Sequence, residues 1–432
     1  MGAKPLAGKA LTAVRASTAS INAYEGTVRS GKTVGEIVAW IKYARQGPAG
    51  TLLMVGKTQR TIKQNVIDPL IEILGTKRCR YVAGAGVLYL LGRMIYVVGA
   101  NDESSVTKIQ GLTLAGALVD EASTMPQTFF EMLYSRLSIE GAQLFLTSNP
   151  AGPQHWLKTD WLDRAKLWID REGREHHNDD EDALDLVRVS FKLEDNPYLP
   201  ADYVERTKKS YRGLFYRRYI LGEWVAAEGA IFDVWDPDRH VVAWKDLPDL
   251  ERLLCLGVDH GTTNPTAGLL LGVGVDGRLY FVDEFRHDPK RDAVRLTDAE
   301  MSQKLIAWIN QPHHPRQKHL RPEYVAVDPA AAGFRLQMHR DGVASSPANN
   351  EVIYGLSLIT SLLGNDQLLV SDRCKGWITE APGYAWDPDA TEKGEDKPLK
   401  VADHSCDGGR YAVTTSEALW RPYLIDPLEL AA

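Results

Sequence analysis

The feature that most constrains this chain is a short glycine-rich segment near its N-terminus. Residues 26–33 read GTVRSGKT and fit the pattern GxxxxGK[ST] at every fixed position. In that pattern backbone N–H groups close around phosphate oxygens, the lysine reaches the β- and γ-phosphates, and the final hydroxyl binds Mg²⁺. Residues Val34–Tyr43 are predicted to continue as a helix, whose N-terminus faces the phosphates and favours their negative charge. The segment predicts an α/β nucleotide-binding domain with ATP and Mg²⁺ as cofactors. Its nucleotide contacts are assigned to Gly26, Arg29, Ser30, Gly31, Lys32 and Thr33.

Two carboxylates follow an apolar run that is predicted to be a strand. Leu114–Val119 leads directly into Asp120 and Glu121. In ATP hydrolysis one such carboxylate holds Mg²⁺ through water, and the other polarises the attacking water. We assign the first role to Asp120 and the second to Glu121. Such a pair alone is typical of a solvated turn, but after a phosphate-binding loop and on a buried strand it favours ATP hydrolysis.

A third polar strand end and two arginines complete the predicted ATPase site. Leu144–Thr147 reads as a strand that ends at Ser148 and Asn149, followed by proline. In P-loop motors a polar residue at this tip senses the γ-phosphate. Phosphoryl transfer also needs positive charge in its transition state. We expect Arg29 to act in cis and Arg136 to reach a neighbour's site in a ring, with an ordinary surface arginine as the alternative for Arg136.

The first half of the chain alternates short apolar runs with amphipathic stretches. Ile62–Leu74 places its apolar residues on one helical face. Strands that alternate with helices indicate an α/β layer structure with a mainly parallel sheet. Further strands are predicted at Thr51–Gly56, Val87–Leu91 and Met94–Val98.

The second half follows a different order. Three strands come in quick succession, and the last two are joined by a hairpin-type turn at residues 274–277. A helix and a further strand follow. This order is that of a ribonuclease-H-like fold, although periodicity alone does not choose it over other α+β domains. The predicted elements are Leu253–Val258, Thr266–Val273, Leu279–Phe285, the helix Ala293–Ile309 and Tyr324–Val327.

Carboxylates stand at the strand ends of this second half. Asp259 ends its first strand, Asp328 ends a later one, and Asp403 and Asp407 lie just before or within a C-terminal helix. Carboxylates on adjacent strand ends and a facing helix make a site for two Mg²⁺ or Mn²⁺ ions, which activate water for phosphodiester hydrolysis. Asp403 and Asp407 are four residues apart and can share a helix face. We favour Asp407 as the metal ligand, with Asp403 and His404 in support.

Three other features have competing interpretations. Asp283 and Glu284 either add a carboxylate to the metal site or form an exposed strand end. The basic and aromatic segment Arg206–Tyr219 either grips DNA phosphates or forms amphipathic linker helices whose aromatics are core, and we favour the second. His313 and His314 lie among prolines and are interpreted as an exposed loop that binds no metal.

Taken together, the motifs resemble the large terminase subunit of tailed bacteriophages, over nearly the whole chain. The resemblance rests on GTVRSGKT, LVDEAS, TSNP, GVDHGTTNPTAG, VAVDPAAAGF and DHSCDGGRYAV, and on a middle segment that is similar to the family's linker. It implies a viral DNA-packaging motor with an N-terminal P-loop ATPase, residues 1–185, a linker subdomain, residues 186–233, and a C-terminal ribonuclease-H-like nuclease, residues 234–432. Lys32, Thr33, Asp120 and Glu121 would then hydrolyse ATP, and Asp259, Asp328 and Asp407 would cut DNA.

The resemblance also implies partners and a location. These are double-stranded DNA, the portal protein, the small terminase subunit and a procapsid, with a pentameric ring when docked and a monomer in isolation as an open alternative. The protein would act in the host cell cytoplasm during assembly and be absent from the mature virion. No apolar stretch reaches the roughly 18 residues of a membrane span. A net charge of −7 argues against a coating nucleic-acid binder but leaves room for local basic channels.

One departure and two alternatives remain. Gly408 and Gly409 stand where relatives usually have Ala-Leu, and each glycine weakens a helix by about 1 kcal/mol relative to alanine. One alternative is a helicase-like ATPase whose second half is only a binding or structural module. The other is an assembly protein that hydrolyses ATP slowly to gate oligomer formation.

Overall fold

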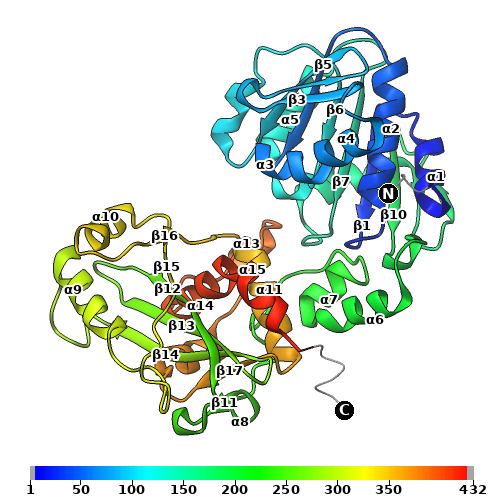
Figure 1. Ribbon diagram of the computed structural model, residues 1–432. Helices are drawn as coiled ribbons and strands as arrows, with labels where there is room; N and C mark the ends of the chain where they lie inside the picture. The colour runs from blue at the N-terminus through cyan, green and yellow to red at the C-terminus, as the bar shows by residue number, and fades with distance from the viewer. Residues whose placement is uncertain (1–4, 426–432) are drawn as a thin grey trace. The chain divides into compact units, whose positions relative to one another are not determined.

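The computed structural model describes residues 5–425, which form two compact units (Figure 1). Unit 1 takes the chain up to Val204, together with Tyr216–Ala226 and Glu392–Glu395; unit 2 takes Glu205–Phe215, Ala227–Thr391 and the chain from Asp396 onward. The boundary predicted at residue 185 falls inside a strand of unit 1, and the linker predicted at 186–233 is divided between the units. Within the described residues, no helix is both long enough and apolar enough to cross a membrane.

Unit 1 is built on a ten-stranded sheet with the order β3-β4-β5-β2-β6-β7-β1-β10-β8-β9. Pairing from β5 to β8 is parallel, whereas β3, β4 and β9 are antiparallel additions at the edges. The mainly parallel sheet predicted from the sequence is confirmed. Its strands are β1 (Ile21–Gly26), β2 (Thr51–Gly56), β3 (Cys79–Val82), β4 (Val87–Leu90), β5 (Arg93–Gly99), β6 (Leu114–Val119), β7 (Gln143–Ser148), β8 (Ala165–Ile169), β9 (Glu175–His177) and β10 (Leu184–Phe191).

Two apolar cores lie on the two faces of this sheet. One contains residues of α1 (Gly8–Ala16) and α2 (Lys32–Gln46), and the other contains residues of α5 (Gln127–Arg136). The single helix predicted at 62–74 is instead divided into three pieces: α3 (Gln59–Ile62), a π-helical turn (Lys63–Ile67) and α4 (Asp68–Leu74). Pro69, at the start of α4, has no N–H to donate, so the regular hydrogen-bond ladder cannot run through it.

Unit 2 is built on a seven-stranded sheet with the order β11-β17-β14-β13-β12-β15-β16. Its centre is the antiparallel meander β12-β13-β14, and β15 adds to β12 in parallel. The three-strand meander followed by a helix and a further strand is the element order predicted from the sequence, and the predicted fold class is confirmed for both units. The strands are β11 (Val241–Val242), β12 (Leu250–Asp259), β13 (Thr266–Gly274), β14 (Leu279–His287), β15 (Tyr324–Val327), β16 (Ser346–Pro347) and β17 (Leu368–Ser371).

Helices cover both faces of the second sheet. A core on one face includes side chains of α9 and α10, while α14 lies directly on β12 and β13. The short helices α6 and α7 carry residues of both units. The helices are α6 (Ala201–Ser210), α7 (Gly213–Tyr219), α8 (Pro237–His240), α9 (Asp298–Ile309), α10 (Ala332–Arg340), α11 (Val352–Gly364), α12 (Lys375–Glu380), α13 (Pro388–Glu392), α14 (His404–Thr415) and α15 (Glu417–Trp420).

The two unexpected glycines of α14 have a packing explanation. A Cβ on Gly408 would lie 3.1 Å from the carbonyl oxygen of Gly257 on β12, and one on Gly409 would lie 2.9 Å from the ring of Phe281. A Cβ on Gly257 would in turn lie 2.2 Å from the Gly408 oxygen. Glycine therefore lets the helix backbone approach the strand closely, which outweighs its weaker helix propensity.

The interpretation of His313 and His314 as an exposed loop is wrong. Their exposed fractions are 1% and 0%. His313 Nδ1 lies 3.0 Å from Asp283 Oδ2, and His314 Nε2 lies 2.8 Å from the oxygen of Pro248. Partners that are distant in sequence stabilise the buried rings, and local composition carries no sign of them.

Candidate functional site

The phosphate-binding loop connects β1 to α2 as predicted. Gly26 (φ 132°) and Gly31 (φ 88°) adopt backbone conformations that favour glycine, and Arg29 (φ 57°) adopts the left-handed region without that freedom. A Cβ on Gly26 would lie 2.2 Å from the oxygen of Phe191, so only glycine lets β1 pass β10 here. Within unit 1, Val28 N–H donates to the Tyr219 oxygen at 3.1 Å.

Lys32 is the buried cation of this loop. Its ammonium donates to the Thr27 oxygen at 3.0 Å and to Asn149 Oδ1 at 2.7 Å. Burial lowers the pKa of Lys32 from its ordinary value of 10.5 to about 8, although Glu121 and other acids act in the opposite direction. The loop thus places a desolvated positive charge at the N-terminus of α2.

Asp120 is held from two sides at the end of β6. Thr147 Oγ1 donates to Asp120 Oδ1 at 3.2 Å, and Asn65 Nδ2 donates to Oδ2 at 2.9 Å. Burial raises the pKa of Asp120, and these hydrogen bonds and the charge of Lys32 oppose that effect. Asn65 lies on the π-helical turn, a feature that often marks functional sites.

The next residue, Glu121, adopts the left-handed conformation with φ 54°. Its backbone N–H donates to Thr147 Oγ1 at 3.2 Å, so the turn after β6 is tied to β7. At the end of β7, Ser148 and Ser123 both donate to the Asn149 oxygen, at 3.0 and 3.2 Å. The loop and two strand ends predicted as parts of one site therefore meet.

The residues present fit a magnesium–nucleotide complex. No side chain caps α2, whose N-cap residue is Gly31, so an anion can accept from its first N–H groups. Lys32 supplies positive charge beside them. Thr33, half-buried in the first turn of α2, and Asp120 supply the oxygen ligands that Mg²⁺ prefers.

The two arginines differ in position. Arg29 is exposed on the loop, and its backbone oxygen accepts from Asn196 Nδ2 at 2.9 Å. Arg136, at the C-terminal end of α5, donates to the Gln110 oxygen at 3.1 Å and to Ser135 Oγ at 3.2 Å. The contacts of Arg136 are thus with its own surroundings and not with the phosphate-binding loop, and its role in a neighbour's site stays a prediction.

In unit 2, Asp259 and Asp328 follow neighbouring parallel strands. Val258 on β12 pairs with Val327 on β15, so the two carboxylates leave the same edge of the sheet. His404 Nδ1 lies 2.8 Å from Asp259 Oδ2. Burial raises the pKa of Asp259; the His404 hydrogen bond opposes this, and the negative charges of Asp407 and Asp328 add to it. The predicted carboxylates therefore act on one another electrostatically.

The carboxylates of α14 already have cationic partners. Lys400 Nζ lies 3.0 Å from Asp403 Oδ2 and 2.8 Å from Asp407 Oδ2, and Arg410 Nη2 lies 2.9 Å from Asp407 Oδ1. Burial acts to raise the pKa of Asp407, but Arg410 and Lys400 hold it below its ordinary value. The ammonium of Lys400 thus lies where a bound cation would neutralise the same two carboxylates.

The donor chemistry of this cluster fits hard divalent cations, because carboxylate oxygens are their usual ligands. Within residues 5–425, however, no three Asp, Glu, His or Cys side chains are grouped tightly enough to hold one ion. Asp403 and Asp407 are paired with Lys400 instead, and Asp259 is paired with His404. Binding two cations would require these pairs to be exchanged for metal contacts.

Asp283 and Glu284, weighed as extra ligands, have other partners, and neither is an exposed strand end. Asp283 pairs with His313. Glu284 accepts from Gly376 N–H at 2.6 Å and from Ser405 Oγ at 2.5 Å, which links α12 to the first turn of α14. Glu284 therefore helps to position the helix that carries Asp407.

The basic segment at 206–219 forms helices with buried members. Phe215 is 2% exposed, and its ring packs edge-on against Trp386 at 6.4 Å. Arg218 is also 2% exposed and donates to the Val225 oxygen at 3.0 Å. The favoured interpretation as packed amphipathic helices is confirmed for these residues.

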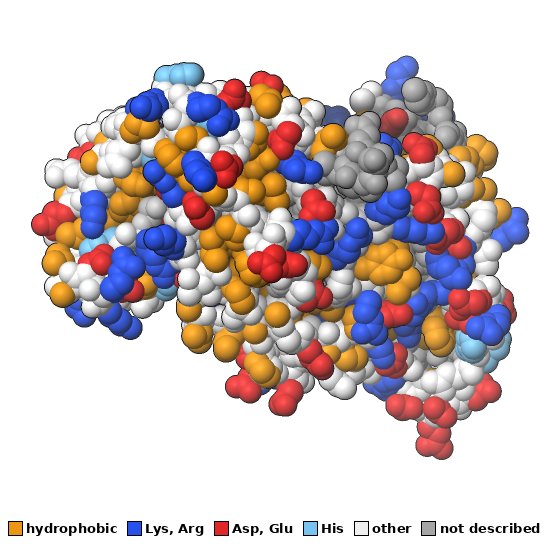
Figure 2. Space-filling model, turned by 90° about the horizontal axis from the view of Figure 1, so that it is seen from below, with side chains coloured by type: hydrophobic (Ala, Val, Ile, Leu, Met, Phe, Trp, Pro, Cys, Tyr) orange, Lys and Arg blue, Asp and Glu red, His pale blue; other side chains and the backbone are white. Residues whose placement is uncertain are grey.

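On the face drawn in Figure 2, basic and acidic side chains are interspersed.

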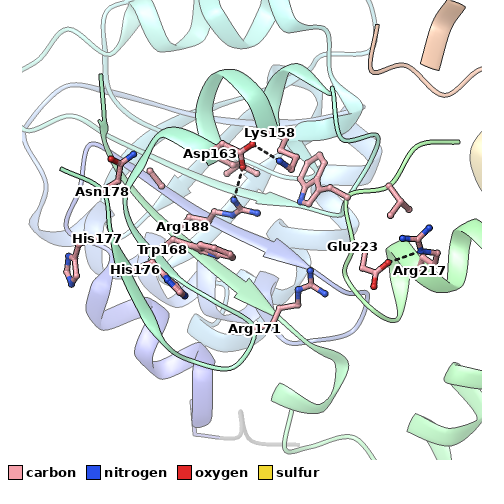
Figure 3. A pocket seen from close by; sticks show the side chains of 14 residues that line it. Lys158, Asp163, Trp168, Arg171, His176, His177, Asn178, Arg188, Arg217 and Glu223 are labelled. Atoms are coloured by element: carbon pink, nitrogen blue, oxygen red, sulfur yellow. Dashed lines mark hydrogen bonds and ion pairs between the residues drawn. The ribbon is translucent and has the colours of Figure 1, made fainter. Parts of the chain in front are cut away.

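A hollow of about 670 Å³ lies beside β8 and β10 in unit 1 (Figure 3). Asp163 pairs with Lys158 and with Arg188, and Arg217 Nε lies 2.8 Å from Glu223 Oε2. No residue of the phosphate-binding loop or of the strand ends described above lines this hollow. Although basic side chains outnumber acidic ones in its lining, the hollow contains none of the groups assigned to the nucleotide site, and we assign it no catalytic role.

Sequence reasoning missed four residues of these sites. Asn65 and Thr147 hold Asp120, Lys400 pairs with two carboxylates, and Glu36 lies buried on α2. Glu36 had a signal, because an acidic residue interrupts the apolar face of α2 one turn after Lys32. The other three depend on contacts between distant segments.

Comparison with known proteins identifies relatives of this chain. A family model described as phage terminase large subunit matches residues 18–223. The terminase large subunit of Escherichia phage T5 is 26% identical over 247 residues, which are 54% of this chain and 52% of that protein. The match thus spans about half the length of this curated relative.

Solved structures of the large terminase from a thermophilic bacteriophage match almost the whole chain. One is 32% identical with a TM-score of 0.82, and covers 96% of this chain and 100% of the other. A second, a complex with ADP, is 31% identical with a TM-score of 0.83 and the same coverage. The likeness extends across both units.

Proposed function

The chain belongs to the phage terminase large-subunit family, and on this premise we propose that it is a viral DNA-packaging motor. It would use ATP to move double-stranded DNA into a procapsid, and it would cut concatemeric DNA with a metal-dependent endonuclease. The observation that carries the proposal is the meeting of the phosphate-binding loop with two strand ends at Lys32, which bonds to Asn149 and faces the charges of Asp120 and Glu121.

ATP hydrolysis is assigned to residues of unit 1. Lys32 and the first N–H groups of α2 bind the phosphates, and Thr33 and Asp120 hold Mg²⁺, which neutralises phosphate charge when bound. Glu121 orients and polarises the attacking water. Arg29 acts in cis on the transition-state charge, and a neighbour's Arg136 is proposed to act in trans.

Asn149 is proposed to couple hydrolysis to movement. Lys32 cannot follow a departing phosphate without changing its 2.7 Å bond to Asn149. Asn149 follows β7, whose Thr147 also holds Asp120 and the Glu121 N–H. A change at the phosphates therefore acts on the end of β7 directly.

DNA cutting is assigned to Asp259, Asp328 and Asp407 of unit 2. Two Mg²⁺ or Mn²⁺ ions at this site would activate water and stabilise the leaving oxygen. Asp259 and Asp328 leave one sheet edge, and α14 brings Asp407 against it. Asp403 and His404 would orient these ligands.

The partners follow from the family and are part of the proposal. They are double-stranded DNA, a portal protein, a small terminase subunit and a procapsid. We propose a pentameric ring when docked, acting in the host cell cytoplasm during assembly and absent from the mature virion.

Plasmid cleavage and ATP hydrolysis by the purified chain test both activities. We expect Asp328→Asn to lose Mn²⁺- or Mg²⁺-dependent cleavage and keep hydrolysis, and Lys32→Ala to do the reverse. Asp238→Asn, which neutralises an exposed carboxylate of unit 2, is the matched control and should keep both.

One observation favours a second candidate, a helicase-like ATPase whose unit 2 only binds or supports. It is the pairing of Asp407 with Lys400 and Arg410, which leaves no three-ligand group among the described residues. Cleavage that is absent in every metal, while hydrolysis persists, would favour this candidate over the nuclease.

A further inference from the structure

Glu36 is a buried acid with no hydrogen-bond partner in the described structure. It lies on α2, four residues after Lys32 and three after Thr33. Its exposed fraction is 0%, and neither Oε1 nor Oε2 has a partner among residues 5–425. Buried polar groups are normally paired, because an unpaired carboxylate loses its hydration without compensation. Two acceptor atoms are therefore left open inside unit 1.

Helix geometry directs this side chain toward the nucleotide site. Side chains on an α-helix lean toward its N-terminus and cover the turn three to four residues earlier. For Glu36 that turn holds Lys32 and Thr33. Burial, and then the negative charge of Asp120, hold the pKa of Glu36 well above its ordinary value, and Lys32 acts the other way. Glu36 thus lies close enough to Asp120 and Lys32 for their charges to act on its pKa.

The apolar core offers Glu36 no alternative partner. Trp40 lies one turn further along α2, and its Nε1 also lacks an acceptor, so the two groups do not meet. The Tyr24 hydroxyl is already bonded to Ser17 Oγ at 2.7 Å. An apolar side chain at position 36 would pack there without losing hydration. A carboxylate at this position gains only if a bound ligand supplies positive charge or donors.

Part of the acceptor capacity of Asp120 is already in use before a ligand binds. Magnesium keeps several of its waters in nucleotide sites, and their protons require acceptors. Both oxygens of Asp120 already accept hydrogen bonds, from Thr147 and from Asn65. The two open oxygens of Glu36 are of the right chemistry to take up the remaining protons.

Resting on the nucleotide site proposed above, we propose that Glu36 is a positioning residue for magnesium. Its carboxylate accepts hydrogen bonds from water on the cation and adds a second negative charge opposite Asp120. The residue stabilises the cation and not the nucleotide.

This role gives a test in which the affinity for metal and the affinity for nucleotide without metal are measured separately. Mn²⁺ binding to the full chain with saturating ATPγS is measured by electron paramagnetic resonance, and ATPγS binding without metal is measured in EDTA. Loss of an outer-shell partner lowers metal affinity by about tenfold or more. We expect Glu36→Gln to bind Mn²⁺ at least about tenfold more weakly and ATPγS without metal as tightly as wild type or more tightly.

Two further variants keep the experiment decisive. Glu36→Met removes the buried carboxylate and should unfold at a higher temperature than wild type, yet show the same loss of Mn²⁺ affinity. Glu72→Gln, which changes an exposed glutamate on α4, is the matched control and should change neither affinity.

Unchanged Mn²⁺ affinity in Glu36→Gln or Glu36→Met overturns the proposal. So does an equal loss of affinity with and without metal, which would mark a structural role. If wild type itself fails to bind ATPγS with Mn²⁺, the proposed nucleotide site is wrong instead.

Discussion

The pH dependence of nucleotide binding tests the central electrostatic feature of unit 1. Burial lowers the pKa of Lys32 from 10.5 to about 8. Above pH 8 the ammonium loses its proton in the free protein, and the site loses the positive charge that attracts phosphate. Bound phosphate favours the charged form, so nucleotide binding must then take up a proton. We therefore expect affinity to fall as pH rises through 8.

The size of the change in affinity follows from the free energy needed to protonate Lys32 when the nucleotide binds. With a pKa of about 8, nearly all molecules carry the charge at pH 7 and about one in ten does at pH 9. The dissociation constant should rise about tenfold between these two values, equivalent to about 1.4 kcal/mol. The nucleotide phosphates add little to this pH dependence. Their last ionisation lies near pH 6 and is nearly complete above pH 7.

The assay is titration of ATPγS at fixed excess Mg²⁺ between pH 7 and pH 9.5, by calorimetry. Glu36 also has a raised pKa, so the series is repeated with Glu36→Gln to remove its titration. Lys32→Arg is the control, because a guanidinium stays charged throughout this range. The control should bind more weakly at every pH, but without the tenfold change.

Two results would refute the reasoning. One is a dissociation constant that stays constant between pH 7 and pH 9 in the wild type. The other is a decline of equal size in Lys32→Arg, which would place the titrating group elsewhere.

Three further predictions follow from other contacts. The free energy of unfolding of wild type, compared with that of Lys32→Met, should rise by about 3 kcal/mol between pH 8 and pH 10.5. The reason is that Lys32 keeps its proton over this range in the unfolded chain but loses it in the folded protein. Denaturant titrations that give the same difference at both pH values would contradict this. Gly257→Ala should destabilise unit 2 by about 3 kcal/mol in urea unfolding, since its Cβ would lie 2.2 Å from the Gly408 oxygen; wild-type stability would disprove the close approach of α14. Lys400→Met removes the cation that is paired with Asp403 and Asp407. The Mn²⁺ concentration that gives half-maximal plasmid cleavage should therefore fall by about fivefold. An unchanged Mn²⁺ concentration would show that Lys400 does not compete with metal.

Much of the fold and part of each site could be predicted because the signals are local. The segment GTVRSGKT contains its own glycines, lysine and hydroxyl, and the strand–loop–helix geometry that it needs forms from neighbouring residues. Asp120, Asp259 and Asp328 were found because each ends an apolar run. Parallel strands bring such ends to one edge of a sheet whatever loops connect them.

The sequence predicted less well where glycine and proline act through packing. Gly408 and Gly409 counted against α14 by helix propensity, yet they let the helix lie on β12. The interruption of the helix at 62–74 places Asn65 on a π-helical turn beside Asp120. In both cases a tertiary contact outweighs the local preference.

By itself, then, the sequence determined which chemical groups stand at the ends of strands and helices, and hence the two classes of site. Tertiary structure alone decided how those groups are charged and paired. Lys400 pairs with Asp407, His313 with Asp283, and Glu36 with no described residue. The physical reason is that backbone geometry depends on neighbours in the chain, whereas burial and ion pairing depend on segments that meet only when the chain has folded.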